Sequence, residues 1–202
     1  MKIIGICGKS GSGKSTVGKL IQKYYPAYID CDLISREVTQ KNSPCLSELV
    51  SFFGNEILLS DGSLNRANLA AVAFGDSLKT SMLNKITHKY ILEKLENLIE
   101  KHKIEREKFV FLDAPTLFES GLDKKCDLIL GVVADEDLLY KRIEKRDKKN
   151  SVEINKRLSM QKNEDFISKN SDYVIVNNGS LEELQEKVNI FLSFIGEKYV
   201  KE

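Results

Sequence analysis

The residues with the clearest chemical potential form a glycine-rich segment near the N-terminus. Residues 8–16 read Gly-Lys-Ser-Gly-Ser-Gly-Lys-Ser-Thr and match the pattern G-x-x-x-x-G-K-[ST]. Its glycines permit backbone angles that turn successive N–H groups toward an anion, and a following helix adds its positive N-terminal end. Lys14 supplies a mobile positive charge for β and γ phosphates, and the Ser15 hydroxyl can ligate Mg²⁺. We therefore predict a nucleoside triphosphate site made by Gly11, Ser12, Gly13, Lys14, Ser15 and Thr16.

The sequence also indicates how the triphosphate is used. Residues 84–87 and 155–158 begin like the guanine-reading pattern N-K-x-D but lack its aspartate, so a GTPase switch is not expected. Asp113 ends an apolar run and could be the strand carboxylate of an ATPase. Ala114 and Pro115 follow it, however, in place of the glutamate that would activate water. This pattern favours a small-molecule kinase over a hydrolase.

Two aspartates follow the second apolar run of the chain. Asp30 and Asp32 lie where the carboxyl end of a strand is expected, which is where open α/β folds bind ligands. A kinase that acts on a hydroxyl group needs a carboxylate to orient it and accept its proton. We predict that Asp32 is this base; the alternative is that Asp32 only caps a helix over residues 33–38. Asp30 is interpreted as a strand-end or metal-shell residue.

Two arginines stand out in the charged segment 135–165. Arg142 and Arg146 are four residues apart, so on a helix both guanidinium groups could reach one polyphosphate. The alternative is a solvated helix face on which the charges pair with one another. His88 and His102 lack the spacing of metal ligands, so we expect no metal role for either.

The elements that must position these residues follow from the apolar pattern. Short apolar runs alternate with helical patterns, which predicts an α/β fold with a parallel five-stranded sheet flanked by helices. The long stretch before the third strand predicts an inserted helical lobe. We expect one P-loop NTPase-like domain with a nucleotide-binding core at 1–31, 109–134 and 170–202, an acceptor-binding lobe at 32–108 and a helical lid at 135–169. The expected strands are residues 3–7, 27–30, 109–113, 128–133 and 173–176.

Composition limits the partners of the protein. The 202 residues include 31 Lys plus Arg and 30 Asp plus Glu, a net charge of +1, so no broad positive field attracts nucleic acid or an anionic membrane. No apolar run approaches the roughly 20 residues that span a bilayer. The four cysteines have no C-x-x-C spacing, which favours thiols over disulfides or a metal site. We expect a cytoplasmic protein, and its oligomeric state is left open.

Taken together, these motifs resemble the dephospho-coenzyme A kinase family over nearly the whole chain. Two departures from the family pattern are present: its histidine-proline is His88-Lys89 here, and Thr116 replaces a leucine after Pro115. The matching segments are the loop at 11–16, I-D-x-D at 29–32, F-G at 53–54, D-G-x-L-x-R at 61–66, L-N-x-I-x-H at 83–88, the P-L-L-x-E element at 115–119, R-x-x-x-R-D at 142–147, Gln161 and N-x-G at 177–179.

The resemblance implies ATP-dependent phosphorylation of the ribose 3′-hydroxyl of dephospho-coenzyme A, the final step of coenzyme A biosynthesis, with Mg²⁺ accompanying ATP. Asp32, Lys14 and Arg142 would be catalytic. The alternatives are a nucleoside or nucleotide monophosphate kinase and a non-catalytic ATP-sensing protein. Beyond the loop, the implied ATP contacts are Arg142, Arg146 and Asn177, and the implied acceptor contacts are Asp32, Arg66, His88, Leu117 and Glu119.

Overall fold

The computed structural model describes residues 1–148 and 150–200. The chain divides into two compact units, one made of residues 1–29 and 102–202 and the other of residues 30–101. Positions 149, 201 and 202, which belong to the expected lid and core ranges, lie outside the described residues. The two units are described separately.

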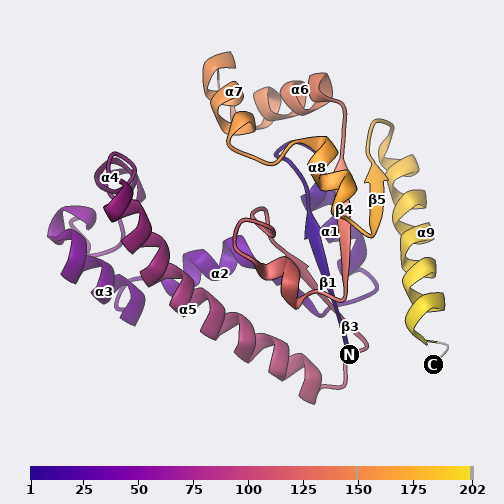
Figure 1. The fold of residues 1–202 in the computed structure, drawn as a ribbon, viewed down its shortest axis with the longest axis horizontal. Helices are drawn as coiled ribbons and strands as arrows, with labels where there is room; N and C mark the ends of the chain where they lie inside the picture. The colour runs from indigo at the N-terminus through magenta and orange to yellow at the C-terminus, as the bar shows by residue number, and fades with distance from the viewer. Residues whose placement is uncertain (149, 201–202) are drawn as a thin grey trace. The chain divides into compact units, whose positions relative to one another are not determined.

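The first unit contains a five-stranded sheet in the order β2-β3-β1-β4-β5. The central strand β1 pairs in parallel with β3 and β4, and β4 pairs in parallel with β5 (Figure 1). The predicted sheet is therefore confirmed, with bounds within one residue of those expected. The strands are β1 (Lys2–Cys7), β2 (Tyr28–Asp30), β3 (Phe109–Asp113), β4 (Leu128–Val133) and β5 (Tyr173–Val176).

Helices α1 (Lys14–Gln22) and α9 (Leu181–Val200) pack against each other and share one apolar core with the sheet. Figure 1 shows α9 running beside β5. Each helix contributes an apolar face, as the 3.6-residue periodicity predicts. Because α1 is anchored in this core, the loop that precedes it is held at the end of β1. The core residues are Ile4, Ile6, Val17, Leu20, Ile21, Phe109, Phe111, Leu128, Leu130, Val132, Ile175, Leu184, Val188, Phe191 and Ile195.

The charged segment expected to be helical forms three helices, α6 (Glu136–Asp147), α7 (Ser151–Ser159) and α8 (Glu164–Lys169). Helices α6 and α7 pack around a small core of their own that includes Leu139, Ile143 and Ile154. A capping box begins α7, because the Asn150 side chain accepts from Glu153 N and Glu153 reaches back to Asn150 N. A short 3₁₀ helix (Leu122–Lys125) precedes β4.

The second unit is helical and has a separate apolar core. It contains α2 (Cys31–Val38), α3 (Pro44–Phe53), a 3₁₀ helix (Asn55–Ile57) and α4 (Arg66–Ala73), and most of α5 (Ser77–Ile104) lies in it. Side-chain caps begin two of its helices: Ser43 Oγ accepts from Leu46 N, and Asn65 Oδ1 accepts from Asn68 N, each at 3.1 Å. Its core residues are Cys45, Leu49, Phe53, Ile57, Leu69, Ala73 and Ile86.

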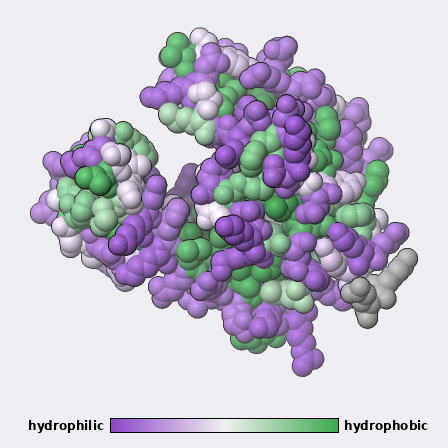
Figure 2. All heavy atoms as spheres, in the orientation of Figure 1, coloured by the Kyte–Doolittle hydropathy of each residue, from purple (hydrophilic) through white to green (hydrophobic). Residues whose placement is uncertain are grey.

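The surface agrees with the balanced composition. Figure 2 shows mostly hydrophilic residues on the face in view, with hydrophobic ones scattered among them. Within residues 1–148 and 150–200, no helix is long and apolar enough to cross a membrane. No disulfide joins the four cysteines, all of which lie in the described part of the chain.

Candidate active site

The phosphate loop connects β1 to α1 and requires glycine at two points. Gly11 has φ +84° and Gly13 has φ +95°, a region that residues with a side chain rarely adopt. Gly13 is also the N-cap of α1, and its carbonyl accepts from Thr16 N at 2.9 Å and from Val17 N at 3.0 Å. The sequence pattern therefore corresponds to a loop whose backbone turns directly into the positive end of a helix.

Asn177 supports this loop through a hydrogen bond to its backbone. Its side chain is buried, with 7% exposed, and Nδ2 donates to the Ser12 carbonyl at 2.8 Å. A Cβ at Gly13 would overlap that same nitrogen atom. Asn177 was predicted as an ATP contact, and the structure places its amide against the loop backbone. The residue therefore holds the backbone of the loop at Ser12.

The two arginines of α6 point to different partners. Arg142 donates through Nη1 to the Gly11 carbonyl at 3.3 Å and through Nη2 to the Asn177 carbonyl at 3.0 Å. Arg146 instead binds Asp147 through Nε at 2.6 Å and Nη2 at 2.9 Å. This carboxylate raises the pKa of the Arg146 guanidinium above its ordinary value. Of the pair, Arg142 is the one brought to the phosphate loop.

A buried carboxylate lies beside the loop lysine. Asp113, at the end of β3, is 5% exposed and forms an ion pair with Lys14. Its second oxygen accepts a hydrogen bond from the Tyr28 hydroxyl at 2.6 Å. From the sequence, Asp113 was a possible ATPase carboxylate, and whether it belongs to the magnesium shell was left open. Nothing in the sequence pattern identified Tyr28.

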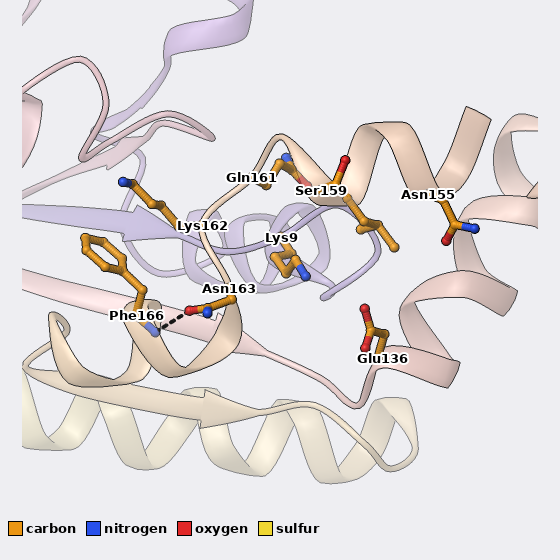
Figure 3. A pocket seen from close by; sticks show the side chains of 9 residues that line it. Lys9, Glu136, Asn155, Ser159, Gln161, Lys162, Asn163 and Phe166 are labelled. Carbon is orange, nitrogen blue, oxygen red and sulfur yellow. Dashed lines mark hydrogen bonds between the residues drawn. The ribbon is translucent and has the colours of Figure 1, made fainter. Parts of the chain in front are cut away.

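Two further features surround the loop. Gln161 Oε1 accepts from Ser10 N at 3.0 Å, and the buried Ser12 hydroxyl has no hydrogen-bond partner in the described structure. A hollow of about 580 Å³ lies next to the loop. Figure 3 shows Lys9, Glu136 and Asn155 pointing into it. Its other lining residues are Leu158, Ser159, Gln161, Lys162, Asn163 and Phe166.

In the helical unit, the structure separates the roles of the two aspartates. Asp30 is the N-cap of α2: Oδ1 accepts from Asp32 N at 2.8 Å and from Leu33 N at 3.1 Å. Asp32 lies in the first turn of this helix with an exposed side chain. The capping alternative considered for Asp32 is therefore wrong, because Asp30 performs that function.

Arg66, at the start of α4, faces a cavity of about 210 Å³ in the same unit. Its Nη2 donates to Thr39 Oγ1 at 2.7 Å, and no carboxylate of the described residues lines the cavity. Thr39 in turn donates to the Ser35 carbonyl at 2.8 Å, which sets the orientation of its hydroxyl. Sequence reasoning missed Thr39. The remaining lining residues are Leu64, Leu69, Ala70, Phe74, Leu83, Asn84 and Thr87.

The departure at position 89 has a structural explanation. Helix α5 continues through His88 and Lys89, where a proline would remove a backbone N–H donor from the helix. Lys89 Nζ binds Glu48 Oε2 of α3 at 3.1 Å, and the Tyr90 hydroxyl donates to the same oxygen at 2.6 Å. The Tyr90 hydrogen bond, with Lys89, lowers the pKa of the Glu48 carboxyl. The His88 side chain is exposed beside this link.

The segment after β3 contains the other predicted acceptor contacts. Thr116 and Glu119 are exposed, and Glu119 borders a narrow hollow together with Lys9 and Gln161. Leu117 is fully buried against Gly5. This burial gives Leu117 a packing role and does not support its prediction as an acceptor contact.

Comparison with known proteins places this geometry in a family. Residues 2–183 match the model of the dephospho-CoA kinase family. The chain belongs to the dephospho-CoA kinase family. A dephospho-CoA kinase from Listeria innocua is 39% identical over 198 residues, which cover 98% of this chain and 99% of the relative. The resemblance inferred from the motifs is thereby confirmed.

Solved structures agree at the level of the fold. The Thermus thermophilus protein TT1252 superposes with a TM-score of 0.79 and 29% identity, covering 95% of this chain and 96% of that one. A dephospho-CoA kinase from Campylobacter jejuni superposes with a TM-score of 0.73 and 22% identity, covering 97% and 98%. The sheet and flanking helices described above are thus the fold expected of a dephospho-CoA kinase.

Proposed function

We propose that this chain transfers the γ-phosphoryl group of ATP to the ribose 3′-hydroxyl of dephospho-coenzyme A, the last step of coenzyme A biosynthesis. Membership of the dephospho-CoA kinase family, together with an intact phosphate loop, is the observation that carries this proposal. In the reaction a bond forms between the 3′-oxygen and the γ-phosphorus. The bond from that phosphorus to the β,γ-bridging oxygen breaks, and ADP leaves.

The donor triphosphate binds at the phosphate loop. Backbone N–H groups of the loop and the first turn of α1 surround the β and γ phosphates, and Lys14 neutralises charge that builds up on the transferring group. The buried Ser12 hydroxyl gains a hydrogen-bond acceptor when phosphate is present, which offsets the cost of about 1–3 kcal/mol for a buried polar group without a partner. The Arg142 guanidinium, which donates to the Gly11 carbonyl, adds positive charge at the same loop.

The oxygen donors near the loop fit a magnesium ion that arrives with ATP. Mg²⁺ binds through phosphate oxygens, water and one or two protein oxygens, and it rarely needs a closed protein cage. Ser15 offers an exposed hydroxyl in the first turn of α1, and Asp113 provides a carboxylate beside Lys14. No cluster of three or more His, Cys, Asp or Glu suited to a metal occurs among the described residues. When bound, the ion would neutralise charge on the β and γ phosphates.

Asp32 is the proposed base on the acceptor side. Since Asp30 satisfies the N–H groups at the start of α2, Asp32 is not required as a cap. Its exposed carboxylate can accept a hydrogen bond from the 3′-hydroxyl and then take its proton as the new bond forms. Substrate closure would exclude water, which competes for the phosphoryl group.

Arg66 is the proposed anion contact for the acceptor. In the described residues its guanidinium donates to a neutral hydroxyl and forms no ion pair, so its positive charge remains available. Dephospho-coenzyme A contains a pyrophosphate, for which a guanidinium is a suitable donor. His88 and Glu119 are exposed, and both are proposed as further contacts for the acceptor.

An acceptor panel tests the proposed function. The purified chain is incubated with ATP and Mg²⁺ and with dephospho-coenzyme A, adenosine, a nucleoside monophosphate or no acceptor, and ADP release is followed. We expect turnover on dephospho-coenzyme A far above that on the other acceptors. Equal or greater turnover on the monophosphate would instead identify a nucleotide kinase, and binding of ATP without any turnover would identify an ATP sensor.

The variant Asp32→Asn tests the assigned base in the same assay. It removes the charge while keeping the shape, so we expect turnover to fall by about 10²- to 10⁴-fold with ATP affinity unchanged. The matched control is Asp30→Asn, which removes the neighbouring charge at the cap of α2. Wild-type turnover by Asp32→Asn would show that another group accepts the proton.

A further inference from the structure

The hydrogen bond from Tyr28 to Asp113 links the edge strand β2 to the carboxylate that pairs with Lys14 of the phosphate loop. Both oxygens of the Asp113 carboxylate are engaged: Oδ1 pairs with Lys14, and Oδ2 accepts from the Tyr28 hydroxyl at 2.6 Å. The carboxylate is 5% exposed, so surrounding water contributes little to its orientation. Rotation of an aspartate carboxylate about χ2 is broad unless its partners restrict it. Two partners on different oxygens restrict it more than one.

A glycine in the middle of α1 makes this contact possible. Gly18 is buried, and a Cβ built at this position would overlap the hydroxyl oxygen of Tyr28 and approach its ring at 2.7 Å. Glycine is among the poorest residues for a helix interior, so its presence in α1 calls for a reason. The structure gives the reason: the Tyr28 ring packs directly against the backbone of α1 at Gly18, where a side chain would overlap it.

We propose that Tyr28 is a positioning residue for phosphoryl transfer, acting through Asp113 on Lys14, and that Gly18 provides the space it needs. Tyr28 holds one carboxylate oxygen so that the other faces the lysine. The ammonium group of Lys14 is thereby kept beside the phosphate loop, from where it moves onto the β and γ phosphates. The role in turnover rests on the proposed kinase function, whereas the effect on ATP binding does not.

The variant Tyr28→Phe removes only the hydroxyl group and keeps the ring. Hydrogen bonds to charged groups are worth enough to predict a fall in kcat of about tenfold or more. KM for dephospho-coenzyme A should stay within about twofold, because Tyr28 is not assigned to the acceptor, and the affinity for ATP should fall by about threefold or more. The matched control is Tyr25→Phe. The Tyr25 ring packs on Phe109 and Phe111 of β3, the strand that ends at Asp113, so this variant should leave all three constants unchanged.

A double-mutant cycle with Asp113→Asn separates positioning from general stability. If Tyr28 acts through the carboxylate, Tyr28→Phe should have no further effect on kcat or on ATP affinity in the Asp113→Asn background. A purely structural role would instead produce the same loss in both backgrounds. Thermal unfolding of all four proteins is recorded, so that a variant that fails to fold is recognised before its kinetics are compared.

Gly18→Ala is a second, independent variant. The added methyl group displaces the Tyr28 hydroxyl, so kcat should fall as in Tyr28→Phe. Adding Gly18→Ala to Tyr28→Phe should lower kcat little further, whereas thermal stability should fall because the methyl group still meets the ring carbon Cζ. Wild-type kcat and ATP affinity in Tyr28→Phe, or equal effects with and without the Asp113 carboxylate, would overturn the inference. If the wild-type chain did not phosphorylate dephospho-coenzyme A, the proposed function would fail, while the ATP-affinity arm of the cycle would still decide the role of Tyr28.

Discussion

Replacement of Asn177 by alanine tests whether the phosphate loop depends on a support outside its own motif. The change removes a donor that is 2.8 Å from the Ser12 carbonyl at a position only 7% exposed. The carbonyl then loses its amide partner in a region with little access to water. A buried polar group left in this state costs about 1–3 kcal/mol. We expect the free energy of unfolding to fall by about 2 kcal/mol, because part of the deleted side chain's contacts is lost as well.

The same change should weaken ATP binding. Because 1.4 kcal/mol corresponds to a factor of ten in an equilibrium constant, a local cost of about 1–3 kcal/mol sets a ceiling of roughly 150-fold on the increase in Kd. The ceiling is reached only if the free loop leaves its binding conformation whenever the support is absent. We therefore expect an increase of about tenfold, measured by titration calorimetry with ATP and Mg²⁺ and paired with urea unfolding.

The neighbouring residue provides the control. Asn178 is exposed, and its side chain donates to Asp135 Oδ1 at 2.7 Å and accepts from Asp135 N at 2.9 Å, away from the phosphate loop backbone. Asn178→Ala removes an amide of equal size from the same turn and should leave the ATP Kd within about twofold. If Asn177→Ala lost stability but bound ATP as tightly as the wild type, or if both variants weakened binding equally, Asn177 would not be a support of the phosphate loop in ATP binding.

Three further predictions concern single residues of the first unit. Arg142→Ala should reduce turnover by about tenfold or more in steady-state assays, whereas Arg146→Ala should reduce it by less than about threefold, because Arg146 is bound to Asp147; a larger effect at Arg146 would contradict this assignment. Lys14→Ala should weaken ATP binding and lower turnover by more than about 10²-fold, and an unchanged rate would contradict the loop argument. Burial raises the pKa of the Cys126 thiol to about 12, from 9.0, so its contribution to stability is complete below pH 9 and is lost as the pH rises toward 12. The free energy of unfolding, measured with denaturant, should therefore decrease over that pH range in the wild type and decrease less in Cys126→Ala. Parallel pH profiles of the two proteins would refute this role of Cys126.

The phosphate loop, the strands and several helix caps were predictable because each depends on residues close together in the sequence. The loop needs glycine and lysine at fixed spacing, and a strand between two helical layers is recognised as a short apolar run. Ser43 and Asn65 satisfy backbone N–H groups three residues ahead of them, so their effect is local as well. The local sequence is therefore sufficient to predict these features.

Contacts between distant segments were not predictable in the same way. The spacing of Arg142 and Arg146 places both on one helix face, but it does not reveal that Asp147 captures one of them. Likewise, the N-x-G step marks Asn177 as part of a turn without indicating that it lies beneath residue 12. Tyr28 gave no local signal. The only trace was Gly18, a glycine inside a helical pattern, whose meaning depends on a ring that comes from the next strand.

The partners of the cations separate those suited to phosphate from those that hold the fold together. Within the described residues, Arg142 donates to two carbonyl oxygens and Arg66 to a hydroxyl, so neither positive charge is neutralised. Arg146 and Lys89 instead pair with carboxylates of their own unit. Lys14 combines both situations, because it pairs with a carboxylate that Tyr28 holds in place. A net charge near zero is therefore compatible with binding two highly anionic substrates. The cations that would bind them are the two arginines that the fold leaves without a carboxylate partner and the lysine whose carboxylate partner is held in place.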